Sequence, residues 1–416
     1  MTRSTPTEHV DYTRVWPFRM LPLLYRRDFE PTDEQVAAFE RYAYVGDPVA
    51  DALVAAIKGG GGSEVRRQFE MALAAGIDSV PDAPQVLRDF FESAEEVPYW
   101  LDQEKLDRAS ELFAGIGPAA APLLMVGLAI TFTTPDGNAV LLRSGDTRDK
   151  AGKRATETLA WVRDVTMPGA LKVGAAGYRS SVRVRLTHAF MRSGFSKRGD
   201  WDNPHLAVNQ QVFSNVIIAF AAYPTLAAAV SGKLFSRRDR EAIFHLWRYV
   251  GHLVGVDQRL LLTDEHDAMR LFWMFFHSVI RPDDSATLLG SALIDAYPEI
   301  YGITGDTRRD AIARWLVLQS HTALARVSIG RDLSDRLGFP KVDPAIAPIL
   351  ASYAALYGAT TLLDVLPPVR RARGSLMRKV QGRLLDAMQQ NTSASVISTL
   401  NRPVDDAARS AAPAAS

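Results

Sequence analysis

The sequence contains no cysteine among its 416 residues. Thiolate-ligated haem, covalently attached c-type haem, iron–sulfur clusters and cysteine nucleophiles all require a cysteine thiol, which this chain does not supply. Disulfide bonds are excluded for the same reason.

The chain also lacks a charge excess of either sign. Its 48 Lys and Arg residues face 47 Asp and Glu residues, which leaves no overall field to attract nucleic acid, so we expect no nucleic-acid partner. The pair Arg26-Arg27 resembles a twin-arginine export signal, but Glu30-Pro31-Thr32 follows where an apolar stretch is required. We therefore expect a cytoplasmic protein.

Alternating strand patterns are scarce, whereas apolar residues recur at helical spacing along most of the chain. With 47% hydrophobic residues the chain can bury a large core, and we predict an all-α fold. Residues 1–100 are expected to form a helical extension packed on a main domain over 101–390. The Ala-, Ser- and Pro-rich segment 391–416 is predicted to be a disordered tail.

One segment, 345–366, has the composition of a membrane-spanning helix, with Asp364 as its single charge. Its Ala, Gly, Thr and Tyr content makes it only mildly hydrophobic, so we predict a buried core helix. The basic stretch 369–384 that follows is compatible with a lipid surface, but a solvated face of a packed terminal helix is favoured. Contact with a membrane surface is therefore not expected.

Several metal and nucleotide sites lack their sequence patterns. No glutamate is followed by a histidine three residues later, and no His-Glu-x-x-His, P-loop or Gly-x-Gly-x-x-Gly pattern occurs. Asp202 with His205, and the acidic group 264–267, lie at expected helix starts, where aspartate caps the backbone. For His245 and His252, core packing is favoured over a ligand role.

His188 is the remaining metal-ligand candidate. On a helix it shares an apolar face with Val184 and Met191, and Arg185 and Arg192 flank it. The segment 148–198 carries twelve basic against three acidic residues. A neutral imidazole, apolar surroundings and nearby guanidinium groups are what haem b needs for its iron and its propionates. An ordinary core histidine, hydrogen-bonded to a carbonyl group, is the alternative.

A longer pattern resembles a known family. Arg154-x-x-x-Thr158 precedes His188 by a fixed interval, Trp247-x-x-x-Gly251-x-x-x-Gly255 follows, and Leu366-Pro367 comes before Arg370. This arrangement resembles the family of the rubber oxygenases and the ER-bound oxygenase of mycophenolic acid synthesis, over most of the chain beyond about residue 100.

The resemblance implies a globin-like helical core with non-covalent haem b around which 101–390 forms the oxygenase catalytic domain. His188 would be the iron ligand. Arg154 would stabilise oxygen or position a propionate, and Thr158 would donate a hydrogen bond. Arg185 and Arg192 are the further cofactor-binding candidates. Glu157 stands where the resemblance to latex clearing proteins implies a lysine, and we assign it the role of a proton-shuttling or iron-facing carboxylate.

We therefore expect a haem b oxygenase that uses dioxygen to oxidise or cleave a carbon–carbon double bond of an apolar, isoprenoid-like small molecule. Three alternatives stay open: a haem sensor or carrier without turnover, cleavage of polyisoprene itself, and a helical interaction protein that binds a partner through its basic segment 148–198. The sequence does not indicate an oligomeric state.

Overall fold

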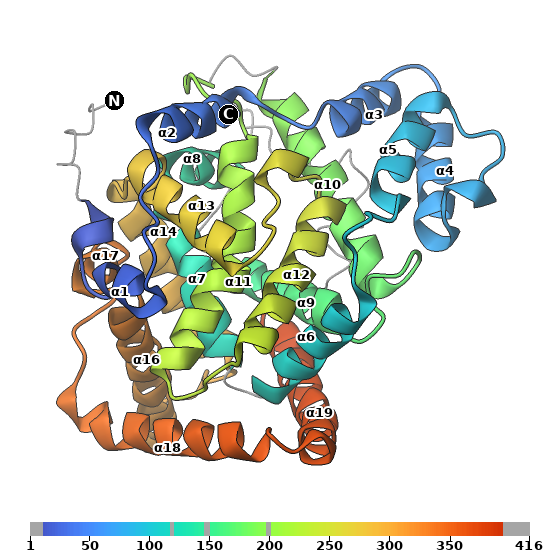
Figure 1. The fold of residues 1–416 in the computed structure, drawn as a ribbon. Coiled ribbons are helices and arrows are strands. Elements are labelled where there is room, and N and C mark those ends of the chain that lie inside the picture. Colours follow the sequence, from blue (N-terminus) through green and yellow to red (C-terminus); the bar gives the residue numbers. More distant parts are fainter. Residues whose placement is uncertain (1–10, 117–119, 145–149, 197–200, 394–416) are drawn as a thin grey trace.

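The computed structural model describes residues 11–116, 120–144, 150–196 and 201–393, and these ranges contain helices and no strand (Figure 1). The all-α prediction is therefore confirmed. The α-helices, in chain order, are α1 (Leu21–Tyr25), α2 (Asp33–Glu40), α3 (Pro48–Lys58), α4 (Gly62–Ala75), α5 (Gln85–Glu95), α6 (Gln103–Ile116), α7 (Ala120–Thr131), α8 (Pro135–Arg143), α9 (Ala151–Thr166), α10 (Ala176–Phe195), α11 (Gln210–Val230), α12 (Arg237–Leu253), α13 (Glu265–Ser278), α14 (Asp284–Asp295), α15 (Tyr297–Ile300), α16 (Arg308–Ser328), α17 (Arg331–Arg336), α18 (Ala347–Leu363) and α19 (Pro367–Asn391).

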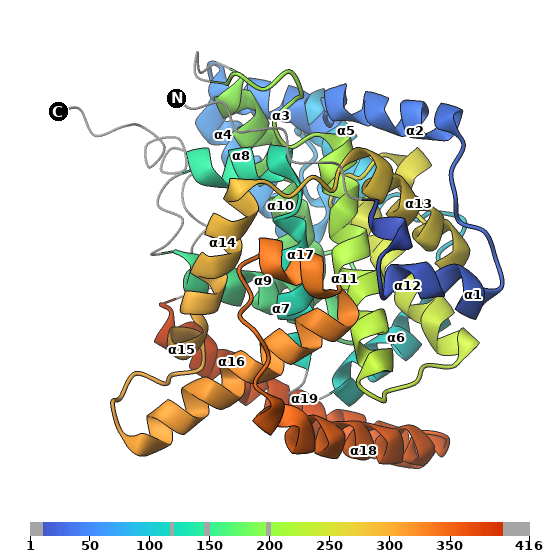
Figure 2. The ribbon, with the colours of Figure 1, turned by 90° about the vertical axis from the view of Figure 1, so that its left-hand side faces the viewer.

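Helix α11 lies in the middle of the molecule, surrounded by α7, α12, α13 and α16 (Figures 1 and 2). Its apolar sequence suits this position, because a helix that is hydrophobic on all sides has to be buried or embedded in lipid. Helix α7 approaches it closely at Gly127, where a Cβ atom would meet the Ala219 carbonyl oxygen at 2.4 Å. The two helices form the centre of the core.

The first hundred residues share this core. Helix α3 packs against α5 and α10, and one continuous cluster of buried apolar side chains extends from Tyr12 to Met388. The domain boundary at residue 100, between the helical extension and the main domain, remains a prediction. The predicted tail, 391–416, begins at the last residue of α19, and its part beyond residue 393 lies outside the described residues.

Two described helices are long and apolar enough to cross a membrane, and a third span arises if the bent pair α6–α7 counts as one. The window 210–229 in α11 is 81% buried, whereas the window 344–363, which contains α18, is only 12% buried. The prediction that 345–366 forms a buried core helix is therefore wrong. Helix α18 lies along the bottom edge of the molecule (Figures 1 and 2).

Candidate functional site

Six helices, among them the central helix α11, line a cavity of about 440 Å³. They are α7, α8, α9, α10, α11 and α14. Its volume falls within the ~300–1,000 Å³ typical of ligand and cofactor sites, and its walls are mainly apolar. The apolar lining residues include Leu128, Phe132, Val140, Leu141, Trp161, Val184, Met191, Val212, Phe213, Phe220, Leu289 and Leu293.

Helix α9 contributes the three predicted polar residues, Arg154, Glu157 and Thr158, to this cavity. Their spacing of three and four residues places them on one face of the helix. The Thr158 hydroxyl donates to the Arg154 carbonyl oxygen at 2.9 Å, and Arg154 Nη2 donates to Ser144 Oγ at 2.8 Å. Burial lowers the pKa of Arg154, and the neighbouring Glu157 carboxylate opposes this shift.

Helix α10 brings His188 to the same cavity, together with Val184 one turn before it and Met191 one turn after it. The imidazole packs edge-on against Phe213, with 4.7 Å between ring centroids. Its Nδ1 atom is buried and has no hydrogen-bond partner among the described residues. Burial, with a smaller effect from Arg192, lowers the pKa of His188 to about 4, so the ring is neutral at pH 7.

This environment differs from that of an ordinary core histidine. A buried polar atom without a partner is unfavourable, and native proteins normally satisfy such atoms. The neutral His188 ring borders an apolar cavity instead, and Nδ1 does not bond to any carbonyl group of the described chain. Histidine binds metals as a neutral imidazole, and the His188 ring is neutral and lies beside an open apolar space.

The structure differs from the prediction for Arg185 and Arg192, because neither lines the cavity. Arg185 is buried against Asp47 at the start of α3, with 2.6 Å between Nε and Oδ2, and its guanidinium lies over the Phe90 ring. Arg192 pairs with Asp51, one turn further along α3, at 2.8 Å. Both guanidinium groups hold α3 against α10, so they are not available to propionates.

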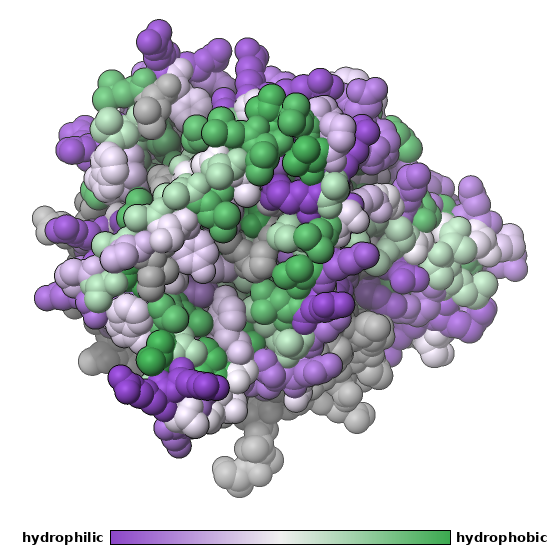
Figure 3. Space-filling model, turned by 90° about the horizontal axis from the view of Figure 1, so that it is seen from below, coloured by the Kyte–Doolittle hydropathy of each residue, from purple (hydrophilic) through white to green (hydrophobic). Residues whose placement is uncertain are grey.

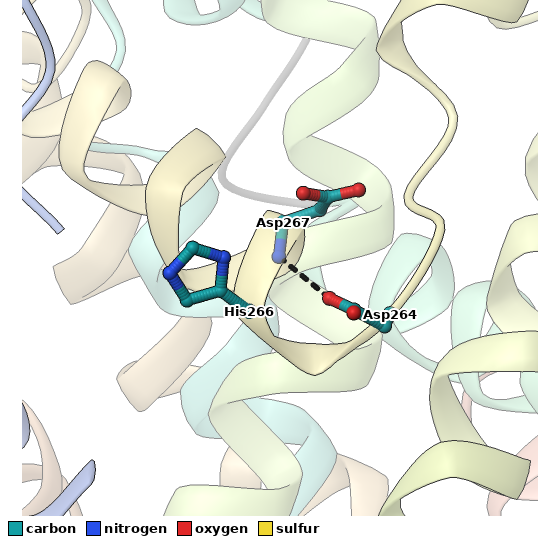
Figure 4. Close-up of side chains that lie close together, drawn as sticks. All are labelled: Asp264, His266 and Asp267. Atoms are coloured by element: carbon teal, nitrogen blue, oxygen red, sulfur yellow. Dashed lines mark hydrogen bonds between the residues drawn. The ribbon is translucent and has the colours of Figure 1, made fainter. Parts of the chain in front are cut away.

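The rival metal sites have simpler explanations. Asp264, His266 and Asp267 lie close together, but the Asp264 carboxylate caps α13 by accepting the Asp267 backbone N–H at 3.0 Å (Figure 4). His205 pairs with Asp136 at 2.6 Å rather than with Asp202. Capping accounts for the first group, and the ion pair with the partly buried Asp136 accounts for His205.

His245 and His252 do not line the cavity either. His245 Nε2 accepts the Asp102 backbone N–H at 2.9 Å, just before α6, and His252 stacks on Tyr249. Both therefore have the packing role that the sequence favoured.

Sequence reasoning missed several polar residues of the cavity wall, among them Thr131, Thr134, Asp136, Asn209 and Asn215. Asn215 is the most informative, because it is a buried amide next to the long apolar stretch of α11 that follows it. A polar residue in such a helix was the available signal. Asn209 caps α11 by accepting the Val212 backbone N–H at 2.9 Å, which explains it without any site. Thr131 and Thr134 each donate a hydroxyl hydrogen to a backbone carbonyl three residues earlier.

Three comparisons with known proteins relate this chain to one family. Residues 109–361 match the model of the family described as ER-bound oxygenase mpaB/B′/rubber oxygenase, catalytic domain. The chain is 26% identical over 329 residues to a rubber oxygenase of Streptomyces sp. (strain K30), which covers 74% of each chain. A solved structure of latex clearing protein in the closed state is similar in fold, with a TM-score of 0.61 at 18% identity, over 83% of this chain and 91% of that one.

Proposed function

This chain belongs to the ER-bound oxygenase mpaB/B′/rubber oxygenase family, and from that membership we propose that it is a haem b-dependent oxygenase. The proposed reaction uses dioxygen to oxidise or cleave a carbon–carbon double bond of an apolar, isoprenoid-like molecule. One observation carries the proposal: Arg154, Glu157, Thr158 and His188, from two helices, line the same apolar cavity.

The residues present fit haem b. His188 offers a neutral imidazole with a buried nitrogen that has no partner among the described residues, and the cavity wall offers apolar surface to a macrocycle. Arg154 supplies a cation at the wall for a propionate, in place of Arg185 and Arg192. When bound, haem would supply the redox-active iron that activates dioxygen.

The other wall residues have roles that follow from their chemistry. Arg154 would stabilise negative charge in a space where few other groups can do so. Thr158 would donate its hydroxyl hydrogen to a ligand by releasing the Arg154 carbonyl oxygen. Glu157 would hold or transfer a proton at its carboxylate. The apolar lining would bind the substrate and exclude water.

The proposed substrate is smaller than the polymer named in the relative's description. Glu157 is a carboxylate and not the amine expected from latex clearing proteins, so it provides different proton chemistry at the same helix position. Oligomers of polyisoprene, terpenoids and unsaturated fatty acids are the compounds to assay. Uptake of dioxygen with one of these classes supports an oxygenase, and binding of haem without uptake supports a carrier.

The first experiment is an absorption spectrum of the protein after reconstitution with haem, oxidised and reduced. We expect a Soret band that His188→Ala abolishes or shifts, because the variant lacks the nitrogen ligand. The matched control is His321→Ala, which removes a buried histidine that is not among the residues lining the cavity. A His188→Ala protein with full haem content and an unchanged spectrum would show that His188 is not the ligand.

A further inference from the structure

Helix α18 presents an apolar surface that the rest of the described chain leaves uncovered. No charged residue occurs between Ala347 and Leu363. We call the exposed side chains Tyr353, Leu356, Leu362, Leu363, Val365 and Leu366 the α18 patch; Leu362 and Val365 are each 75% exposed. Figure 3 shows hydrophobic groups spread over much of this lower face. Soluble monomers rarely expose so many large apolar residues together.

The opposite side of α18 is packed. Tyr357 is buried, and the Thr361 hydroxyl oxygen accepts the Leu234 backbone N–H at 3.3 Å. A Cβ atom on Gly232 would meet the Ala354 carbonyl oxygen at 2.7 Å, so the turn after α11 lies directly against the helix backbone. The patch is therefore the outward face of a helix held in a defined orientation.

Both ends of α18 are attached to the same side of the molecule. Just before the helix, the Asp343 backbone N–H donates to Gln319 Oε1 at 2.7 Å. Just after it, the Asp364 carboxylate forms ion pairs with Lys233 and Arg373. A helix fixed at both ends along one surface lies in the plane of a membrane interface instead of crossing the bilayer.

Positive charge adjoins the α18 patch. Three residues separate α19 from α18, and α19 contains six basic residues against one acid, Asp386. Arg370 and Arg373 are paired with Glu111 and Asp364. The more exposed basic residues of α19 are Arg371, whose Nε lies 3.6 Å from Glu111 Oε1, and Lys379 and Arg383, which lie further along the helix. An apolar strip with exposed cations beside it complements an anionic lipid surface.

We propose that the α18 patch docks the protein onto a membrane surface that contains anionic lipids. Helix α18 lies flat at the level of the headgroups, and exposed basic residues of α19 contact lipid phosphates. A second copy of the chain fits this surface less well, because a two-fold interface places the same patch, with its cations, against itself. The proposal concerns binding alone and holds whatever reaction the cavity performs.

Flotation with lipid vesicles tests the proposal. The wild-type protein is expected to float with vesicles of phosphatidylcholine and phosphatidylserine, less with phosphatidylcholine alone, and less as salt rises. The double variant Leu362→Asp/Val365→Asp should lower the partition coefficient at least ~10-fold, equivalent to ~1.4 kcal/mol. The triple variant Arg371→Glu/Lys379→Glu/Arg383→Glu should lose the preference for phosphatidylserine.

The matched control is Leu23→Asp, which places the same charge at a leucine that is 68% exposed on α1, away from the lower face in both ribbon views. It should bind vesicles as the wild type does, and circular dichroism should show all variants folded. Wild-type protein that stays unbound to both vesicle types overturns the proposal. So does size-exclusion chromatography that shows a wild-type dimer, monomeric patch variants and no vesicle binding.

Discussion

At the scale of single residues, Arg185 and His188 are three positions apart on α10 but contact different parts of the protein. His188 borders the cavity, whereas the Arg185 side chain leaves α10 on the side of α3 and reaches Asp47. Gly255 makes room for this ion pair, because a Cβ atom there would lie 2.4 Å from Asp47 Oδ2 and 2.5 Å from Arg185 Nε. Its φ of +84° also disfavours other residues. Arg185 is a structural residue.

Replacing Arg185 with methionine should therefore destabilise the fold without changing the cavity. The variant leaves the Asp47 carboxylate buried without its cation, and breaking such a pair costs about 3–5 kcal/mol. We expect this loss in the free energy of unfolding, measured by urea denaturation, together with haem uptake equal to that of the wild type.

The matched control is Arg237→Met on α12, where the ion pair with Glu241 is on the surface and Arg237 is 86% exposed. A surface pair is worth at most ~1 kcal/mol, so this variant should remain close to the wild type. If Arg185→Met loses haem while remaining folded, the sequence-based assignment of Arg185 to a propionate is restored.

At the scale of helices, the sequence predicted which residues share one face of a helix, because the spacing between them determines this. The interval from Arg154 to Thr158 is one helical turn, so the polar face of α9 could be foreseen, and the apolar face around His188 likewise follows from the positions of Val184 and Met191. These faces do meet at one cavity. The prediction that the α9 and α10 faces belong to one site depended on the family resemblance. Residue spacing within one helix does not show which other helix that helix faces.

Contacts between segments distant in the sequence could not be predicted from residue spacing. Asp47 lies 138 positions before Arg185, and nothing local to α10 indicates that its arginines meet acids on α3. The prediction that α18 is a buried core helix was wrong for a related reason. A mildly apolar sequence has the same composition whether protein or lipid covers it. Only the position of its neighbours shows that the outward face of α18 has no protein cover in the described chain.

The face of α10 that borders the cavity gives a second test. Val184 lies one turn before His188 on that face, so Val184→Trp should fill the space beside the imidazole. We expect haem uptake to fall at least ~10-fold, with a stability change within the ~1–3 kcal/mol usual for an enlarged core residue. Titration with haem, followed by absorbance, measures the first effect.

Val97→Trp, at an exposed position just beyond α5, is the control for the added indole, and it should bind haem normally. Unchanged uptake by Val184→Trp would mean that haem binds elsewhere or that the cavity is not its site. The variant does not touch the iron ligand, so it tests the space separately from the nitrogen atom.

At the scale of the whole molecule, several histidines are built into the core as neutral rings. Burial lowers the pKa values of His245, His252 and His321 to about 4, from an ordinary value of 6.5. His321 is within hydrogen-bonding distance of the Val317 carbonyl oxygen through Nδ1, at 2.7 Å, and of the Tyr301 hydroxyl through Nε2, at 3.2 Å. Nδ1 therefore carries the proton, and Nε2 accepts from Tyr301.

Acid should destabilise this fold before its carboxylates titrate. As the pH falls below 6.5, the unfolded chain binds a proton at each of these histidines, while the folded protein does not until about pH 4. Protons therefore favour unfolding across that range, and each such histidine lowers the free energy of unfolding by about 2 kcal/mol at pH 5 relative to pH 7. Urea denaturation at a series of pH values measures the slope.

His321→Phe isolates one contribution, because phenylalanine keeps an aromatic ring against Tyr297, whose ring lies 4.3 Å from that of His321, but cannot bind a proton. The variant should be less stable than the wild type at pH 7, since Val317 and Tyr301 lose their partner. Its further loss between pH 7 and pH 5 should be smaller than that of the wild type by about 2 kcal/mol. An equal loss in both proteins would show that His321 does not titrate differently in the folded and unfolded states, and that the acid response originates in other groups.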